Sequence, residues 1–248
     1  MRGDALTHTL SASGLTFGYP GRQPVLADVS LEISPAEKVG VIGPNGAGKT
    51  TFFMLICGVL APVGGGVEVF GRAVQHGKFQ PDVGMVFHHT NDQLICPSAR
   101  EDIAFGPQNM GLSEAEVDAR VETAAAATGI TALLDRVPHE LSSGEQRLVA
   151  LTGILAMTPR MLILDEPTSD LDLRYRRRLI NMIAEMTEQT MLVASHDLEF
   201  IIETCDRVLL IDDGRIQADG PPAEVMSDAT LMQAHGLEVP HSLVARWH

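Results

Sequence analysis

Short, largely apolar runs are the clearest pattern along this chain. Three of them, at residues 38–42, 161–164 and 191–194, show no alternation of apolar and polar positions. A run of this length without alternation predicts a strand that is buried on both faces, as in a parallel sheet covered by helices. Because such strands alternate with helical segments from Lys38 to Ile211, we expect a single α/β layer system.

Helical patterns fill much of the region between the first two of these strands. Ser113 and Glu116 have the spacing of a helix start ahead of an alanine-rich run that reaches Ala127. Gly214, after two aspartates, predicts a tight hairpin turn. The expected parts are a mixed-sheet core at about 1–87 and 160–220, an inserted helical subdomain at about 88–159, and a helical tail at about 221–248.

Residues 43–51 read GPNGAGKTT and fit the pattern of a phosphate-binding loop between a strand and a helix. Glycines let the backbone N–H groups turn toward phosphates, and the helix that begins near Lys49 adds the positive end of its dipole. We expect Lys49 to bridge the β- and γ-phosphates of ATP and the Thr50 hydroxyl to ligate Mg²⁺. An ordinary glycine-rich turn is the alternative, which the flanking strand and helix disfavour. The predicted nucleotide-binding residues of this loop are Gly43, Pro44, Asn45, Gly46, Ala47, Gly48, Lys49, Thr50 and Thr51.

Two carboxylates follow the apolar run at residues 161–164. Asp165 and Glu166 should emerge at the C-terminal edge of that strand, where open parallel sheets bind their ligands. We expect Asp165 to hold Mg²⁺ through its water shell, and Glu166 to orient or deprotonate the water that attacks the γ-phosphate. The alternative is a solvated acidic pair before a turn at Pro167, which the upstream phosphate-binding loop disfavours.

The motif LSSGEQ at residues 141–146 makes the chain resemble ATP-binding cassette (ABC) ATPases. Other motifs of that family follow in the family's order, and the resemblance covers nearly the whole chain. It implies the P-loop NTPase fold of an ABC nucleotide-binding domain, and ATP hydrolysis coupled to transport. By the same resemblance, Tyr19 stacks on adenine, Asp172 belongs to the D-loop, and His196 is the switch histidine that senses the γ-phosphate. A histidine after a strand is often only structural, but the Ser-His-Asp context favours the switch.

LSSGEQ also stands at the start of an apolar helix expected over about residues 145–157. In the family, this terminus meets the γ-phosphate held by a partner subunit, which implies a homodimer with two shared ATP sites. Ser142 and Gly144 carry that role here, whereas Ser143 and Glu145 replace the usual glycine and glutamine. The alternative makes Ser142 a helix cap with Glu145 as its capping-box partner, and the two roles are compatible.

Residues 84–112, GMVFHHTNDQLICPSAREDIAFGPQNMGL, resemble the ATPase subunits of energy-coupling factor transporters. The matching residues are Asp92, Gln93, Glu101, Asp102, Ala104, Phe105, Gly106 and Pro107, with Gly236, Leu237 and Pro240 in the tail. Such ATPases drive an integral membrane coupling subunit and a small substrate-binding membrane subunit, and we expect the former to dock at residues 88–107. The branch with one ATPase, acting as a homodimer, includes cobalt and nickel importers. Cobalt is therefore the expected cargo, with nickel next and a vitamin such as biotin as the alternative.

His88 stands where the family usually has a glutamine that touches Mg²⁺ or the attacking water. A neutral imidazole offers one acceptor nitrogen at shorter reach than an amide oxygen, so we expect hydrolysis to be slowed or retimed. A metal site at His88 and His89 is another interpretation. It is disfavoured because adjacent side chains at a strand end point apart and no third ligand is near in sequence.

The chain carries a formal net charge of −14, which opposes direct binding to nucleic acid or to anionic lipid. Cys57, Cys96 and Cys205 are odd in number and unspaced for metal or disulfide use, so we expect reduced core residues. The N-terminus lacks the apolar stretch of a secretory signal, and no apolar run is long enough to span a bilayer. We therefore expect a place at the cytoplasmic face of the membrane, reached through membrane partners.

Two function classes other than a transport ATPase stay open. One is a soluble cassette ATPase that acts on nucleic acid or ribosomes, which the acidic charge and the single cassette disfavour. The other is a regulatory module that binds ATP with little turnover, for which His88 and Ser143 are the only support.

Overall fold

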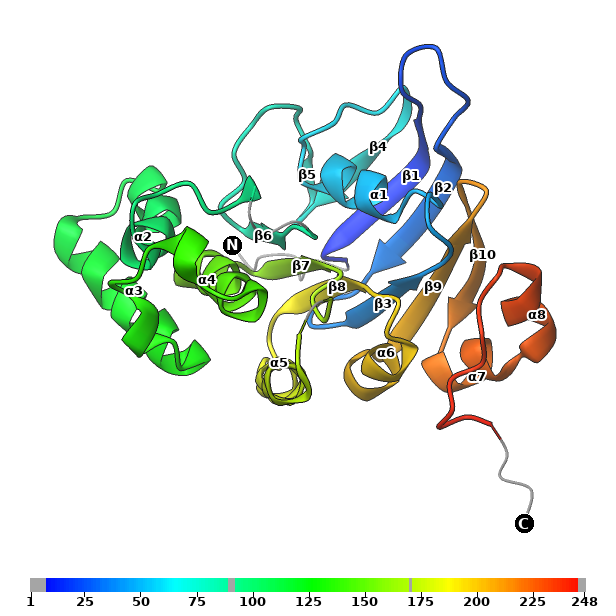
Figure 1. The fold of residues 1–248 in the computed structure, drawn as a ribbon. Coiled ribbons are helices and arrows are strands. Elements are labelled where there is room, and N and C mark those ends of the chain that lie inside the picture. Colours follow the sequence, from blue (N-terminus) through cyan, green and yellow to red (C-terminus); the bar gives the residue numbers. More distant parts are fainter. Residues whose placement is uncertain (1–7, 89–91, 170, 245–248) are drawn as a thin grey trace, which may run out of the picture. The chain divides into compact units, whose positions relative to one another are not determined.

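The computed structural model describes residues 8–88, 92–169 and 171–244. The chain divides into two compact units. Unit 1 consists of Met1–Phe79 and Glu188–His248, and unit 2 of Gln80–Thr187. The α-helices and strands of both units are labelled in Figure 1. The fold is that expected from the sequence, an α/β structure with mixed strands and a set of helices.

Unit 1 contains an antiparallel sheet with the strand order β2-β1-β4-β5. Its strands are β1 (Leu10–Phe17), β2 (Leu26–Ile33), β4 (Gly64–Val69) and β5 (Arg72–Ala73). Along β2, the buried side chains of Val29, Leu31 and Ile33 alternate with exposed ones. This alternation places one face of the sheet in the core and leaves the other to solvent.

The remaining strands of unit 1 follow the order β10-β9-β3-β8. They are β3 (Lys38–Ile42), β8 (Thr190–Ala194), β9 (Arg207–Asp212) and β10 (Arg215–Gly220). β3 pairs in parallel with both β8 and β9, and all five residues of β8 are buried, as the unbroken apolar runs predict. The predicted hairpin is confirmed: β9 and β10 pair antiparallel around Asp213 and Gly214, whose φ angles are 48° and 69°.

Within its described residues, unit 1 contains four helices. They are α1 (Lys49–Ile56), α6 (Leu198–Thr204), α7 (Pro222–Ser227) and α8 (Ala229–Ala234). α1 stops before Leu60 because Gly58 takes a left-handed φ of 72°, and the Val59 N–H then bonds back to the Met54 carbonyl at 2.9 Å. The expected helical tail holds α7 and α8.

Unit 2 combines two parallel strands with helices. Its elements are β6 (Val83–Val86), β7 (Met161–Asp165), α2 (Ala99–Asn109), α3 (Glu114–Thr128), α4 (Ser143–Ala156), α5 (Leu173–Glu185), and the short 3₁₀ helices η2 (Thr131–Leu133) and η3 (Pro138–Glu140). Every residue of β6 and β7 is buried. Ser113 caps α3 in a capping box with Glu116, which confirms the predicted helix start.

The helices of unit 2 share an apolar core. Ile103 of α2, Val121 of α3 and Val149 of α4 are each fully buried in one cluster. Burying a Val or Ile side chain contributes about 1.5–3 kcal/mol, so this cluster holds the three helices together. The helix carrying LSSGEQ therefore rests on α2 and α3.

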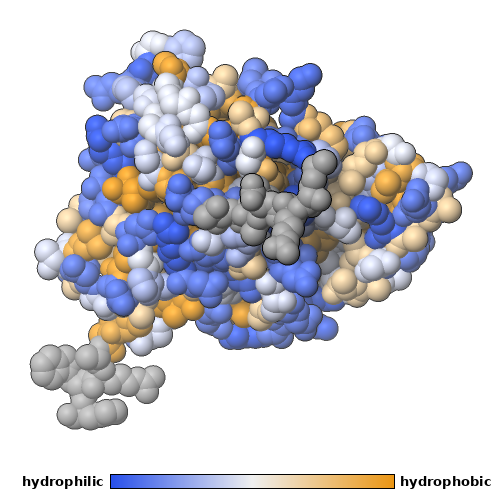
Figure 2. Space-filling model, turned by 180° about the vertical axis from the view of Figure 1, so that it is seen from behind, coloured by the Kyte–Doolittle hydropathy of each residue, from blue (hydrophilic) through white to orange (hydrophobic). Residues whose placement is uncertain are grey.

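Three further observations concern the surface, membrane-spanning helices and the cysteines. Hydrophobic side chains are scattered among hydrophilic ones on the face shown in Figure 2, in keeping with the acidic composition. Within the described residues, no helix is long and apolar enough to cross a membrane. Cys205 is buried as expected, but the prediction of core positions was wrong for Cys57 and Cys96, which are only partly buried.

Candidate functional site

In the phosphate-binding loop of unit 1, the lysine side chain bonds back to the main chain of the loop. Lys49 Nζ donates to the carbonyl oxygens of Gly43 at 2.7 Å and Pro44 at 3.0 Å, and the residue is only 8% exposed. Gly43 has a φ of 147°, and a Cβ there would lie 2.0 Å from the Ile211 carbonyl oxygen. Only glycine fits at this position, so the bend of the loop depends on Gly43.

The start of α1 is suited to an anion. Gly48, its N-cap residue with a φ of 101°, has no side chain that could cap the first N–H groups of the helix. Thr50 is exposed, whereas Ala47 and Thr51 are buried. The loop thus presents backbone N–H groups and one hydroxyl to a ligand.

His196 belongs to the same edge of unit 1 as this loop. β3 and β8 run parallel with Val41 opposite Ala194, so the phosphate-binding loop and His196 both follow the C-terminal ends of neighbouring strands. The His196 side chain is exposed, and the neighbouring Asp197 caps α6 by accepting the Phe200 N–H at 2.9 Å. The predicted switch histidine is therefore held by a fixed turn.

Tyr19 follows β1 and presents a partly free aromatic ring. It is 39% exposed, and its ring packs edge-on against Phe17 with centroids 5.0 Å apart and an interplanar angle of 86°. Contact with Phe17 fixes the ring while leaving surface for stacking.

In unit 2, the predicted catalytic carboxylates leave the sheet beside His88. β6 and β7 run parallel with Val86 opposite Leu164, so His88 and the pair Asp165 and Glu166 follow neighbouring strand ends. Asp165 is 2% exposed and Glu166 is 6% exposed. Glu166 has a φ of 52°, an uncommon conformation for a residue with a side chain that often marks functional turns.

A buried arginine that the sequence analysis did not identify connects these two segments. Arg147 of α4 is 6% exposed; its Nη1 donates to the Glu166 main-chain carbonyl and its Nη2 to that of His88 at 3.0 Å. The signal for it was present, because Arg147 is the one charged residue between Gln146 and the end of the apolar helix.

LSSGEQ forms the N-terminus of α4, which begins at Ser143, two residues earlier than expected. The Ser142 N–H and hydroxyl donate to Glu145 Oε2 at 2.9 and 2.8 Å, and the Glu145 N–H donates to the hydroxyl at 3.4 Å. The capping-box role is thus confirmed. Hydrogen bonding, first from the Ser142 backbone N–H and then from its hydroxyl, lowers the pKa of Glu145. Ser142 and Ser143 are exposed and Gly144 is buried.

Asp172, the N-cap residue of α5, lies beside this motif. Its side chain caps α5 by accepting the Tyr175 N–H at 2.9 Å, and the residue is exposed. A Cβ on Gly144 would lie 3.3 Å from the Tyr175 ring and 3.5 Å from Leu171, so the LSSGEQ turn packs closely on this segment. The structure therefore brings the predicted D-loop and signature residues together.

Gln93 bonds back to the end of β6. Its Nε2 donates to the Met85 carbonyl at 3.0 Å, and its Oε1 accepts the Phe87 N–H at 3.2 Å. The side-chain amide thus pairs with the strand end as another strand would. His89 lies outside the described residues, and within the described part of the chain no group of three metal-ligating side chains occurs.

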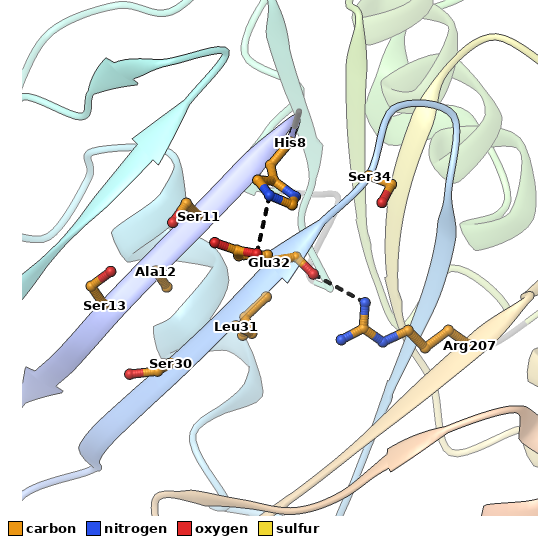
Figure 3. A pocket seen from close by; sticks show the side chains of 9 residues that line it. All are labelled: His8, Ser11, Ala12, Ser13, Ser30, Leu31, Glu32, Ser34 and Arg207. Carbon is orange, nitrogen blue, oxygen red and sulfur yellow. Dashed lines mark hydrogen bonds and ion pairs between the residues drawn. The ribbon is translucent and has the colours of Figure 1, made fainter. Parts of the chain in front are cut away.

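A separate pocket of about 580 Å³ lies in unit 1 (Figure 3). Its lining residues are His8, Ser11, Ala12, Ser13, Ser30, Leu31, Glu32, Ser34 and Arg207. His8 pairs with Glu32 at 3.0 Å, and Arg207 bonds to Asp219 and to Glu37. These bonds, that to Asp219 above all, raise the pKa of Arg207, and the two carboxylates balance its positive charge. The pocket contains none of the predicted site residues and offers phosphate no uncommitted arginine.

Comparison with known proteins agrees with these motifs. A family model described as ABC transporter matches residues 26–169. The energy-coupling factor transporter ATP-binding protein EcfA of Methanothermobacter thermautotrophicus is 39% identical, covering 92% of this chain and 76% of the relative. The cobalt import ATP-binding protein CbiO of Rhodobacter capsulatus is 40% identical, covering 95% of this chain and 86% of the relative.

A solved structure gives the same result. That of cbiO1 from Clostridium perfringens, part of the ABC transporter complex cbiONQ, superposes with a TM-score of 0.80 at 31% identity. It covers 92% of this chain and 94% of the other. This chain is therefore a member of the ABC transporter family, an ATP-binding and ATP-hydrolysing subunit similar to those of energy-coupling factor importers.

Proposed function

We propose that this ATPase powers the uptake of a transition metal ion, with cobalt as the first candidate and nickel as the second. The observation that supports this cargo is the 40% identity to a cobalt import CbiO over 95% of the chain. The EcfA relative carries no solute in its name. A vitamin importer of the biotin type is therefore the alternative, since residues 84–112 resemble the transporter group as a whole.

In the proposed ATP site, each predicted residue keeps one role. Lys49 and the backbone of the phosphate-binding loop hold the phosphates, Tyr19 stacks on adenine, and His196 hydrogen-bonds the γ-phosphate. Glu166 orients or deprotonates the attacking water. What supports the assignment of Glu166 is its buried position in a turn of positive φ at the end of β7.

Thr50 and Asp165 are suited to Mg²⁺. One offers an exposed hydroxyl at the start of α1, and the other a buried carboxylate at the end of β7. Oxygen donors of this kind are those that Mg²⁺ takes beside nucleotide phosphates and water. The bound ion would neutralise charge on the β- and γ-phosphates. His88, at the usual glutamine position, would contact the ion or the water less completely.

We propose that two copies of the chain share two ATP sites. Ser142, Ser143, Gly144, Glu145 and Asp172 would face the nucleotide held by the second copy. The exposed positions of Ser142, Ser143 and Asp172 support this role.

The proposed place of the complex is the cytoplasmic face of the cell membrane, with an integral coupling subunit docked at residues 88–107. Two large apolar side chains in this segment support docking, because Ile95 is 69% and Phe105 48% exposed. A substrate-binding membrane subunit would complete the importer, and nucleic acid has no part in it.

The cargo is tested by reconstituting the chain in vesicles with candidate membrane subunits of the energy-coupling factor type from the same organism. We expect ATP-dependent uptake of radioactive cobalt that Glu166→Gln reduces by about 10²- to 10⁴-fold, the usual cost of losing a general base. Uptake of biotin and not of cobalt or nickel would move the assignment to the vitamin importers. Undiminished hydrolysis by Glu166→Gln would refute the role of Glu166.

A further inference from the structure

Arg147 joins two loops that the proposed reaction uses. Its guanidinium donates Nη1 to the carbonyl of Glu166 and Nη2 to the carbonyl of His88. These residues follow the ends of β7 and β6, strands that are hydrogen-bonded in parallel. One side chain thus bridges the catalytic turn and the loop that carries His88.

The chemistry of the side chain makes this bridge rigid. A guanidinium is planar, and its N–H donors point in fixed directions, so its two Nη atoms fix the separation of the carbonyls that they bind. Arg147 is 6% exposed, and a buried cation that loses a hydrogen-bond partner is strongly unfavourable. The two carbonyls are therefore held in place against displacement.

The bonded carbonyl belongs to Glu166 itself, whose φ of 52° is uncommon for a residue with a side chain. Such a conformation is unfavourable for a residue with a side chain and persists only where the surroundings hold it. A bond to the peptide that follows Glu166 restrains that peptide, and with it the direction of the carboxylate.

The other end of the bridge leads to the proposed docking segment. Gln93 fixes the backbone on both sides of Val86 through Met85 and Phe87, immediately before His88. A shift of His88 on docking would move its carbonyl, and Arg147 would pass the shift to Glu166.

We propose that Arg147 is a positioning residue that sets the rate of ATP hydrolysis by holding the Glu166 turn in register with the His88 loop. It acts through main-chain carbonyls and does not contact ATP. The proposal rests on the proposed catalytic role of Glu166.

Arg120 provides a matched control. It also holds main-chain carbonyls within unit 2, with Nη1 donating to Met157 at 3.0 Å and to Ala156 at 3.3 Å. These carbonyls lie at the C-terminal end of α4, at the opposite end from LSSGEQ. Variants of Arg120 therefore show what the loss of an arginine that binds main-chain carbonyls does by itself, without loss of the Arg147 bridge.

The test measures steady-state ATP hydrolysis by the full chain carrying Arg147→Lys, Arg147→Ala, Arg120→Lys or Arg120→Ala. Lysine keeps the charge but not the two-pronged donor geometry, so Arg147→Lys should lower kcat by about 10- to 100-fold, the cost of a small misplacement. The KM for ATP should stay within about twofold, because binding does not use the bridge. Added guanidinium ion should restore part of kcat to Arg147→Ala but not to Arg120→Ala.

Wild-type kcat in Arg147→Lys would overturn the proposal. So would equal losses in the Arg147 and Arg120 lysine variants, or a kcat that falls only in proportion to the folded fraction measured by circular dichroism. Arg147→Lys preserves the charge and keeps the test valid if Arg147→Ala does not fold. Glu166→Gln is measured in parallel: if it stays fully active, the proposed function of Glu166 fails, whereas if it alone loses turnover, only the Arg147 inference fails.

Discussion

Ser142 and Glu145 hold each other across the first turn of α4, with the Ser142 hydroxyl 2.8 Å from Glu145 Oε2. The ionised carboxylate accepts both Ser142 donors, and this lowers the pKa of Glu145. A carboxylate whose pKa is lowered in the folded chain stabilises the fold when the pH is above 4.5, the ordinary pKa of glutamate. This stability is lost as the pH falls below 4.5 toward the lowered pKa.

Glu145→Gln should therefore be less stable to urea than the wild type at pH 7, and the difference should shrink as the pH falls below 4.5. Ser142→Ala, which removes the cap itself, should cost about 0.5–2 kcal/mol. Equilibrium unfolding across pH measures both. If the loss of unfolding free energy in Glu145→Gln is the same at every pH, the carboxylate charge is not what stabilises the turn.

Nucleotide should assemble two copies of the chain. In a Glu166→Gln background, which slows hydrolysis, Mg-ATP should shift the sedimenting mass from monomer to dimer. Ser142→Arg should block this shift, because a long cation replaces the small hydroxyl that would meet the partner's nucleotide. A monomer that binds and hydrolyses ATP at full rate would contradict the shared sites.

His88→Gln should raise basal hydrolysis without abolishing transport. Glutamine reaches farther than imidazole and brings an amide oxygen with two lone pairs to the ion or the water. Paired measurements of ATP hydrolysis and uptake on the reconstituted complex check this. An unchanged ratio of uptake to hydrolysis would remove His88 from the coupling role.

Gln93→Ala should destabilise the loop after β6 and also weaken coupling. The variant leaves the Met85 carbonyl and the Phe87 N–H without their amide partner, and a buried group left in that state costs about 1–3 kcal/mol. Gln93→Glu keeps the acceptor for Phe87 but sets a carboxylate oxygen against the Met85 carbonyl, so its cost should be at least as large. Urea unfolding and uptake assays on both variants measure the two effects, and a fully stable Gln93→Ala would show that the Gln93 amide does not stabilise the end of β6.

The cysteines should react slowly with iodoacetamide at pH 8. Burial raises the pKa of Cys57 and of Cys205 to about 12, and burial together with Asp102 raises that of Cys96 to about 11. Since the thiolate is the reactive form, only about one thiol in a thousand to ten thousand is reactive at this pH. Peptide mass spectrometry should find Cys96 modified first and all three modified rapidly in concentrated urea. Fast labelling of native Cys205 would contradict its burial.

Local sequence determined the parts of the site that a short segment can build. The phosphate-binding loop needs Gly43 and Gly48 for its left-handed backbone, and the Ser142 cap needs Glu145 three residues later. Unbroken apolar runs likewise predicted β3, β7 and β8, because strands buried on both faces leave no room for polar side chains.

Only the tertiary structure decided how Arg147, Gln93 and Asp102 are used. Arg147 bonds to residues 19 and 59 positions away, and Asp102 Oδ1 accepts the N–H groups of Ile95 and Cys96, so its carboxylate holds the loop before α2. In every case the partner is a main-chain group. All residues carry a main-chain carbonyl, and all but proline an N–H, so no side-chain pattern in the sequence marks such a partner. The sequence determined which side chains could donate or accept hydrogen bonds. The packing of α4 and of the strand ends determined which main-chain groups became their partners.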